Sequence, residues 1–177
     1  MSSIQINGNT SGSITIEAPA VAGTNTLTLP ASTGTLATTA DITGPAFSAY
    51  SSTTQAMTTA TWTKIVFGTE LFDTNSNYDT ATARFTPTVA GYYQLNATIY
   101  TTGTITRCFT QLYLNGDAIK HLFDITSAIN RSGGSALMYM NGSTDYLEVY
   151  AFVQGTGLQV EANQQGTRFE AALIRGA

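Results

Sequence analysis

The sequence predicts an all-β protein: a ten-stranded sandwich of the jelly-roll type, preceded by an extended, β-rich N-terminal arm. Many short segments alternate between apolar and polar residues with a period of two, as in Tyr93, Leu95, Ala97 and Ile99. Turn residues separate these segments at short, regular intervals. No segment repeats apolar residues at helical spacing over three turns, so the pattern favours strands throughout.

The composition excludes several classes of protein. Only 10% of the 177 residues are charged, against roughly 25% in an average domain, and Thr, Ser, Asn and Gly replace the missing ions. Seven Lys and Arg, spread singly in a chain of net charge -4, form no basic stripe for nucleic acid. No apolar run is long enough to span a membrane, and the start lacks the regions of a secretory signal. We therefore expect assembly in a cytoplasm, without membrane insertion.

Residues 1–43 form the predicted arm, which is low in complexity and free of aromatic residues. Its short alternating pieces are bounded by turn residues and are too sparse in apolar side chains to build a core alone. One alternative is a disordered arm; the other is an arm whose strands pair with copies of itself or with another surface. The second alternative gives six candidate residues for anchoring to a larger particle: Ile4, Ile6, Ile14, Ile16, Leu27 and Leu29.

Residues 45–177 form the predicted head, and Gly44-Pro45 marks its junction with the arm. Asn115-Gly116 predicts a tight hairpin, residues 140–145 predict a second turn, and Pro87 and Gly91 predict a corner between two sheets. The ten expected strands are 46–50, 61–68, 82–86, 91–101, 106–115, 117–123, 135–140, 145–154, 157–162 and 167–175.

Alternation divides the apolar side chains of the head into an inward and an outward set. The expected core is Phe47, Ile65, Phe67, Phe85, Tyr93, Leu95, Ala97, Ile99, Leu112, Leu114, Leu137, Tyr139, Leu147, Val149, Val153, Leu158, Val160, Phe169, Ala171 and Leu173. The outward aromatic residues are Tyr92, Tyr100, Phe109, Tyr113, Tyr146, Tyr150 and Phe152. Because so many outward rings are unusual on a monomer, we predict that they lie in a subunit interface.

The ordered motifs of the head resemble the globular head of complement component C1q, within the tumour-necrosis-factor-like jelly-roll superfamily. They are "PAFSAY" (45–50), "TKIVFGTELFDTNSNYDTATARFTPTVAGYYQL" (63–95), "QLYLNG" (111–116), "GGSALMYMNGSTDYLEVYAF" (133–152) and "TRFEAALI" (167–174). The chain departs from the family pattern by a small insertion between Gly142 and Asp145 and by the absence of a collagen tract. The resemblance implies a homotrimer closed around a threefold axis.

The same resemblance implies a possible calcium site, since family members often hold calcium through acidic ligands. The loop "ELFDTNSNYD" offers Glu70, Asp73, Asn75, Asn77 and Asp79 as oxygen ligands. The alternative, which we favour, is a polar loop built from Asx turns. No other cofactor is expected.

Catalysis is not expected. His121 is the only histidine and Cys108 the only cysteine. They are too few for a zinc site, and a catalytic triad would require His121 to meet a serine and Asp117 or Asp124. A lone cysteine also excludes an intrachain disulfide. The glycine-rich stretch 130–135 lacks the strand and helix that would flank a phosphate loop.

The arm carries a second resemblance. Its stretch "TNTLTLPASTGTLATTADI" is similar to segments of bacteriophage tail-fibre and virion-fibre proteins that precede a distal knob. This implies a virion protein displayed on the particle exterior: a short trimeric fibre or spike, with an arm bound to capsid or tail proteins. The head would bind a host receptor or glycan through polar loops, for which 51–60, 68–80, 124–133 and 154–157 are the candidates.

Two alternatives remain open at this point. The protein could be a capsid decoration or cement protein with a purely structural role. It could also be a secreted complement-like lectin, although the missing signal peptide and the arm disfavour that interpretation.

Overall fold

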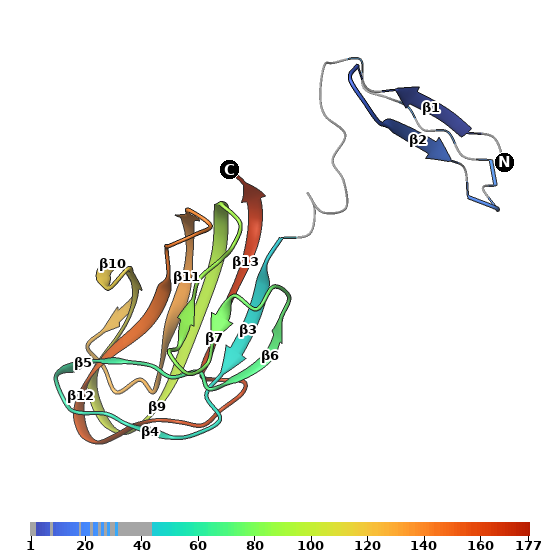
Figure 1. Ribbon diagram of the computed structural model, residues 1–177. Coiled ribbons are helices and arrows are strands. Elements are labelled where there is room, and N and C mark those ends of the chain that lie inside the picture. Colours follow the sequence, from blue (N-terminus) through green and yellow to red (C-terminus); the bar gives the residue numbers. More distant parts are fainter. Residues whose placement is uncertain are drawn as a thin grey trace. The chain divides into compact units, whose positions relative to one another are not determined.

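The structure is a computed structural model, and it describes residues 44–177 together with parts of the N-terminal region (Figure 1). The described N-terminal residues are 3–7, 9–17, 19–21, 23, 24, 26, 28 and 31. Leu27 and Leu29, two of the anchoring candidates, therefore lie outside the described residues. The chain divides into two compact units, 1–36 and 37–177.

The N-terminal unit contains an antiparallel hairpin of β1 (Ser3–Asn7) and β2 (Ser13–Glu17). Ile4 lies opposite Ile16, and Ile6 lies opposite Ile14. The alternating pieces predicted around these isoleucines are thus strands paired with each other.

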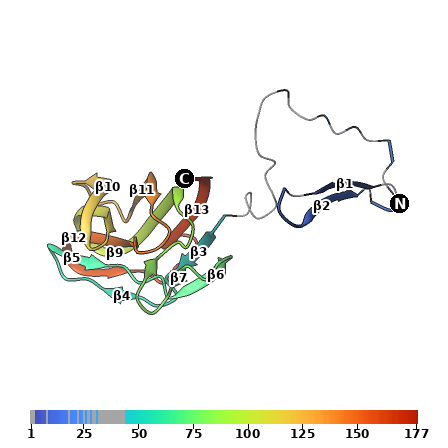
Figure 2. The same cartoon turned by 45° about the horizontal axis from the view of Figure 1, so that its top comes forward.

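The head consists of eleven strands in a curved sandwich (Figures 1 and 2). They are β3 (Ala46–Tyr50), β4 (Gln55–Ala56), β5 (Thr61–Lys64), β6 (Thr69–Asp73), β7 (Tyr78–Asp79), β8 (Arg84–Phe85), β9 (Gly91–Leu114), β10 (Asp117–Ile125), β11 (Arg131–Met140), β12 (Leu147–Val160) and β13 (Arg168–Gly176). The described residues hold no helix long and apolar enough to cross a lipid bilayer.

The long strand β9 belongs to both layers of the sandwich. Its first half pairs with β13 on one side and β11 on the other, and β13 continues through β3 to β6. Its second half pairs with β10 and β12, and β12 also pairs with β4, β5 and β8. We call these the first and second layers. Between the halves, Gly103 has a φ of 107°, a conformation that glycine adopts without steric cost.

The segment between β8 and β9 forms the predicted corner. β8 belongs to the second layer and β9 begins in the first, so Pro87 and Gly91 bracket the crossing between sheets. Tyr93 points into the core, where its hydroxyl donates to the carbonyl oxygen of Val89 at 2.7 Å. Tyr92 points outward. The prediction that the two tyrosines lie on opposite sides of one strand is confirmed.

Aromatic rings fill the centre of the core. Phe47 stacks on Tyr78 and Phe85 with ring centroids 4.7 Å and 4.6 Å apart, and Phe169 meets it edge-on at 5.0 Å. Aliphatic side chains of β9 and β12 extend the core on both sides. Stability therefore comes from interdigitated packing of the two layers.

The all-β prediction is confirmed, whereas the strand count differs. Each of the ten expected strands overlaps an observed one, but 91–101 and 106–115 are one strand, β9, and 145–154 and 157–162 are one strand, β12. Glycines with positive φ, such as Gly103 and Gly155, let these strands bend without losing their pairing. The short strands β4, β6 and β7 were not predicted.

The expected core is correct except on β11. Leu137 and Tyr139 are exposed, and Ala136, Met138 and Met140 point inward instead. Both faces of this strand carry apolar residues, so alternation alone cannot tell which face is inside. Leu114 and Leu173 are only partly buried against the core, and the other expected core residues are buried.

Candidate functional site on the outer faces of the head

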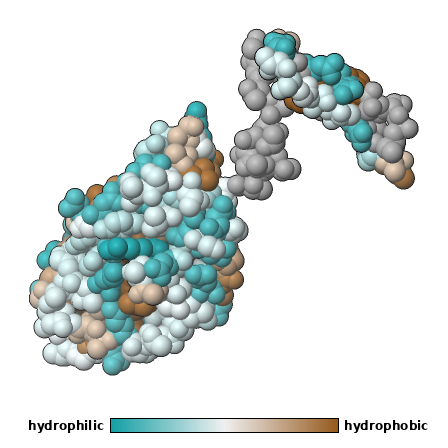
Figure 3. Space-filling view, in the orientation of Figure 1, coloured by the Kyte–Doolittle hydropathy of each residue, from teal (hydrophilic) through white to brown (hydrophobic). Residues whose placement is uncertain are grey.

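On the outer face of the first layer, four large exposed side chains gather over β9, β11 and β13, and we call them the apolar face. The exposed fractions are 44% for Tyr92, 58% for Leu137, 48% for Tyr139 and 59% for Ile174. Tyr92 and Tyr139 are direct cross-strand partners, with ring centroids 5.6 Å apart. On the side of the head seen in Figure 3, the hydrophobic areas are small and separate. A group of this kind on one subunit is typical of an interaction surface.

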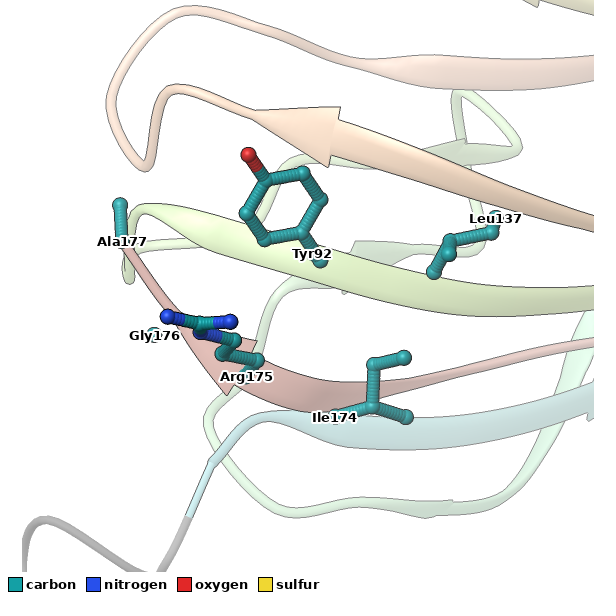
Figure 4. Close-up of a pocket in the computed structure, with 6 residues that line it drawn as sticks. All are labelled: Tyr92, Leu137, Ile174, Arg175, Gly176 and Ala177. Carbon is teal, nitrogen blue, oxygen red and sulfur yellow. The ribbon is translucent and has the colours of Figure 1, made fainter.

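The apolar face borders an open hollow of about 520 Å³. Tyr92, Leu137 and Ile174 come from the neighbouring strands β9, β11 and β13 and surround it, together with Arg175, Gly176 and Ala177 (Figure 4). Apart from the Arg175 guanidinium, the lining is mainly apolar or small. The hollow therefore suits an apolar side chain of a partner better than a charged ligand.

The outer face of the second layer carries five rings, which we call the aromatic face: Trp62, Phe109, Tyr113, Tyr150 and Phe152. The Trp62 ring centroid lies 5.5 Å from that of Phe152 and 5.8 Å from that of Phe109, and Tyr113 stacks on Tyr150 at 4.0 Å. Burial raises the pKa of the Tyr113 and Tyr150 hydroxyls. These rings largely cover one another, so they leave less apolar surface open than the apolar face does.

A buried carboxylate lies beside the aromatic face. Glu148 Oε1 accepts hydrogen bonds from Lys64 Nζ at 3.1 Å and from Arg84 Nε at 2.8 Å. The bond to Glu148 raises the pKa of the Arg84 guanidinium, which also lies 4.1 Å above the ring of Tyr146. Since the three charged residues belong to β12, β5 and β8, the cluster connects three strands and is structural.

The structure divides the predicted interface residues between the two layers. Tyr92 belongs to the apolar face, and Tyr100 lies at the end of the first layer, 5.2 Å from the Arg131 guanidinium. The other five lie on or beside the aromatic face: Phe109, Tyr113, Tyr146, Tyr150 and Phe152. Alternation shows which side of a strand is outward, but not that β9 passes from one layer to the other. Their role in a trimer stays a prediction.

Sequence reasoning missed four residues on these faces. Alternation predicts Leu137 and Tyr139 in the core and predicts no role for Trp62 and Ile174. The sequence could have revealed the last two, because residues an odd number of positions apart on a strand face opposite sides. Trp62 lies three positions before the inward-facing Ile65, and Ile174 lies one position after the inward-facing Leu173.

The carboxylates of the possible calcium loop cap turns. Asp73 accepts the backbone N–H groups of Asn75 at 3.2 Å and of Tyr78 at 2.6 Å. Asp79 accepts the Thr82 hydroxyl at 2.7 Å, a bond that lowers the pKa of this carboxyl. Glu70 lies apart on β6, opposite Ala49. In the part of the chain that the structure describes, no three His, Cys, Asp or Glu side chains gather as metal ligands.

Cys108 and His121 lie on opposite sides of the second layer. Cys108 is buried in the core, where burial raises the pKa of its thiol and the Sγ lies 3.1 Å from the Ser132 hydroxyl. His121 packs its ring against Phe109 on the outer face, with centroids 5.7 Å apart. The pair therefore cannot act together on one substrate.

Three of the four candidate attachment loops share one end of the head. Gly155 N–H donates to the Thr59 hydroxyl at 3.1 Å, which joins loops 154–157 and 51–60. Asn130 of loop 124–133 accepts the N–H of Thr101, whose neighbour across the sheet is Val160 of β12. The turn in 68–80 lies at the opposite end, because Thr74 N–H donates to Ala46 at the start of β3. We call the end that carries loops 51–60, 124–133 and 154–157 the far end, because it lies opposite the start of β3 at Ala46.

Two curved β-layers joined by one bent strand, with an aromatic core between them, form a jelly-roll domain. The model of the C1q domain family matches residues 46–173. The chain belongs to the C1q domain family.

Solved structures show the same fold at low sequence identity. The globular domain of zebrafish complement 1qA protein is 20% identical, with a TM-score of 0.54, over 76% of this chain and 100% of that chain. A crystal structure of murine APRIL, at pH 8.0, is 12% identical, with a TM-score of 0.58, over 75% of this chain and 100% of that chain. No curated protein matches the sequence.

Proposed function

We propose that the chain is a bacteriophage virion protein: a short homotrimeric fibre or spike with a head that attaches to the host surface. In this proposal the arm, residues 1–43, binds other virion proteins of the capsid or tail. The fold supports a binding role, because C1q and tumour-necrosis-factor-like domains are binding and structural domains and not enzymes. The fibre-like segment of the arm supports the virion setting.

The main observation in support of a homotrimer is the apolar face. Tyr92, Leu137, Tyr139 and Ile174 expose about half of their surface on a single subunit, and a hollow beside them can receive a partner's side chain. A charge-poor chain has little electrostatic repulsion to keep such faces apart. A closed symmetric assembly of identical subunits would cover them.

The far end supports attachment. Its loops consist largely of threonine, serine, asparagine, glutamine and glycine, whose hydroxyl and amide groups can exchange hydrogen bonds with a sugar or a polar protein surface. Three copies on each spike, and many spikes on each particle, would multiply a weak affinity for each site. A spike needs no catalytic group for this role.

The trimer is tested by measuring the mass of the full chain in solution by sedimentation equilibrium. We expect three times the 18.7 kDa of one chain. Leu137→Glu places a charge in the apolar face and should shift the mass toward one chain, whereas Ser127→Glu, in an exposed loop, should leave it unchanged. A native chain that stays monomeric at micromolar concentration would contradict the proposal.

Attachment is tested by incubating the labelled full chain with bacterial cells and, separately, by imaging particles that contain it. Binding to cells that weakens when Thr59 and Thr156 are both replaced by Glu would support the far end as the attachment surface. Density on particles without any binding to cells would instead support the decoration protein.

A further inference from the structure

The β1–β2 hairpin has one purely aliphatic face, which we call the isoleucine face. Ile4, Ile6, Ile14 and Ile16 lie on the same side, because they form two directly opposed cross-strand pairs. Their exposed fractions are 66%, 55%, 70% and 48%. The other side is polar: Gln5 lies opposite Thr15, and its side-chain amide donates to the Ser13 hydroxyl at 2.9 Å.

We infer that the isoleucine face packs against the same face of two further copies of this chain, so that three hairpins together form one apolar core. This inference rests on the proposed homotrimer and names the partner of the hairpin within it. A two-stranded hairpin alone is marginally stable in water. Four exposed isoleucines on one side of the hairpin are typical of a surface that another apolar surface buries.

The length of the connecting chain favours the other copies as that cover. Residues 18–43 separate the hairpin from the head, and 26 residues reach at most ~90 Å even when fully extended. A hairpin confined to a sphere of that radius has an effective concentration of about 0.5 mM toward its neighbours. No partner in dilute solution meets the isoleucine face at such a concentration.

The chemistry of the face also favours self-association. All four side chains are β-branched aliphatics that stand on a pleated surface, so identical faces can interdigitate without leaving a polar group unpaired. Glu17 is the only charged side chain between Ser3 and Glu17, and it lies in register with Ser3, outside the isoleucine pairs. Three copies therefore meet without a cluster of like charges in their core. Anchoring to the particle is then left to the polar side and to the residues that follow the hairpin.

Disulfide cross-linking in the full chain tests this arrangement. Ile14→Cys places a thiol on the isoleucine face, and Thr15→Cys places one on the polar side, one residue away. We expect Ile14→Cys to form covalent dimers under mild oxidation at least tenfold faster than Thr15→Cys. Cys108 is buried in both variants, and the unsubstituted chain serves as its control. Ile6→Cys and Gln5→Cys repeat the comparison on β1.

Sedimentation of the same samples separates failure of this inference from failure of the proposed function. Equal cross-linking rates on the two sides, in a chain whose mass is that of a trimer, would overturn the isoleucine core alone. A monomeric mass would overturn both. Fast cross-linking confined to the Ile6→Cys and Ile14→Cys variants would support the arrangement.

Discussion

Glu148 is a single carboxylate that joins three strands of the second layer. Its side chain is almost fully buried, and the side chains of its two cationic partners, Lys64 and Arg84, are 32% and 40% exposed. Once such a group is out of water, removing its charge leaves Lys64 and Arg84 without their common anionic partner. In a head with so few charges, this cluster is the main electrostatic contribution to holding β5 and β8 against β12.

We expect Glu148→Gln to lower the free energy of unfolding by roughly 2 kcal/mol, because the amide keeps the shape but loses the charge-assisted bonds. Asp124→Asn is the matched control. It alters an exposed pair in which Arg107 lies 3.5 Å away, so the cost should stay below about 0.5 kcal/mol. Urea denaturation of both variants measures the difference, and equal costs would contradict the structural role given to Glu148.

The buried tyrosines make stability depend on pH in the alkaline range. Desolvation raises the pKa of Tyr93 from 10.0 to about 12, and burial raises the pKa of Tyr78 still further. Both hydroxyls therefore stay protonated in the folded head at a pH where the unfolded chain has begun to lose these protons. The stabilisation is complete below pH 10 and is lost as the pH rises through the folded pKa.

We expect the free energy of unfolding to fall between pH 10 and pH 12 by about 1.4 kcal/mol per pH unit for each such tyrosine. Tyr93→Phe should make this fall less steep. It should also cost about 1 kcal/mol at pH 8, since the bond to Val89 is lost. Urea titrations at several pH values measure both effects.

At the scale of elements, two glycines of β12 allow the cost of steric crowding to be measured apart from the cost of backbone conformation. Gly155 and Gly157 both have positive φ, at 147° and 64°. A Cβ on Gly155 would lie against the carbonyl oxygen of Thr104 on β9, whereas a Cβ on Gly157 would meet no atom within 4 Å. Both lie where the pairing of β12 with β9 shifts register.

Gly157→Ala should therefore cost about 1 kcal/mol, the penalty for a left-handed conformation alone. Gly155→Ala should cost several times as much, because the two strands must separate to admit the methyl group. Thermal unfolding of the two variants gives the comparison. Similar losses would show that β9 and β12 are not closely apposed at Thr104.

Local chemistry made the turns of the head predictable from the sequence. Asn115 and Gly116 have φ values of 55° and 89°, as a tight hairpin requires. Asn141 accepts the backbone N–H groups of Ser143, Thr144 and Asp145 in the turn before β12. Both turns depend on residues within a few positions of one another, which a sequence displays directly.

The candidate faces were harder to predict, because they depend on which layer a strand joins. Leu137 and Tyr139 read as core residues, since large apolar side chains are usually inside. They are outside because Ala136 and Met140 already fill the core beneath β11. Alternation places Phe109 and Tyr92 in one outward-facing set, which suggests a single surface. The bend in β9 instead places them on different layers. Neither fact follows from the local alternation of residues.

At the scale of the whole molecule, a homotrimer couples stability to concentration. If association stabilises the folded subunits, the midpoint temperature of unfolding, Tm, rises with protein concentration. We expect Tm to increase by a few degrees per tenfold increase in native protein. Leu137→Glu should abolish this dependence and Ser127→Glu should preserve it. Calorimetry at two concentrations is sufficient, and a Tm independent of concentration in the native chain would contradict the coupling.

The position of β3 has a mechanical consequence. This first strand of the head is hydrogen-bonded on one side to β13 and on the other to β6, both antiparallel to it. In the proposed spike, a head held at Ala46 and pulled from the far end would be stretched along the axis of β3. Both ladders would then be sheared along their length, with all of their hydrogen bonds strained together and none opened singly. If the proposed attachment holds, flow that pulls a bound particle away from a cell would load these two ladders in shear.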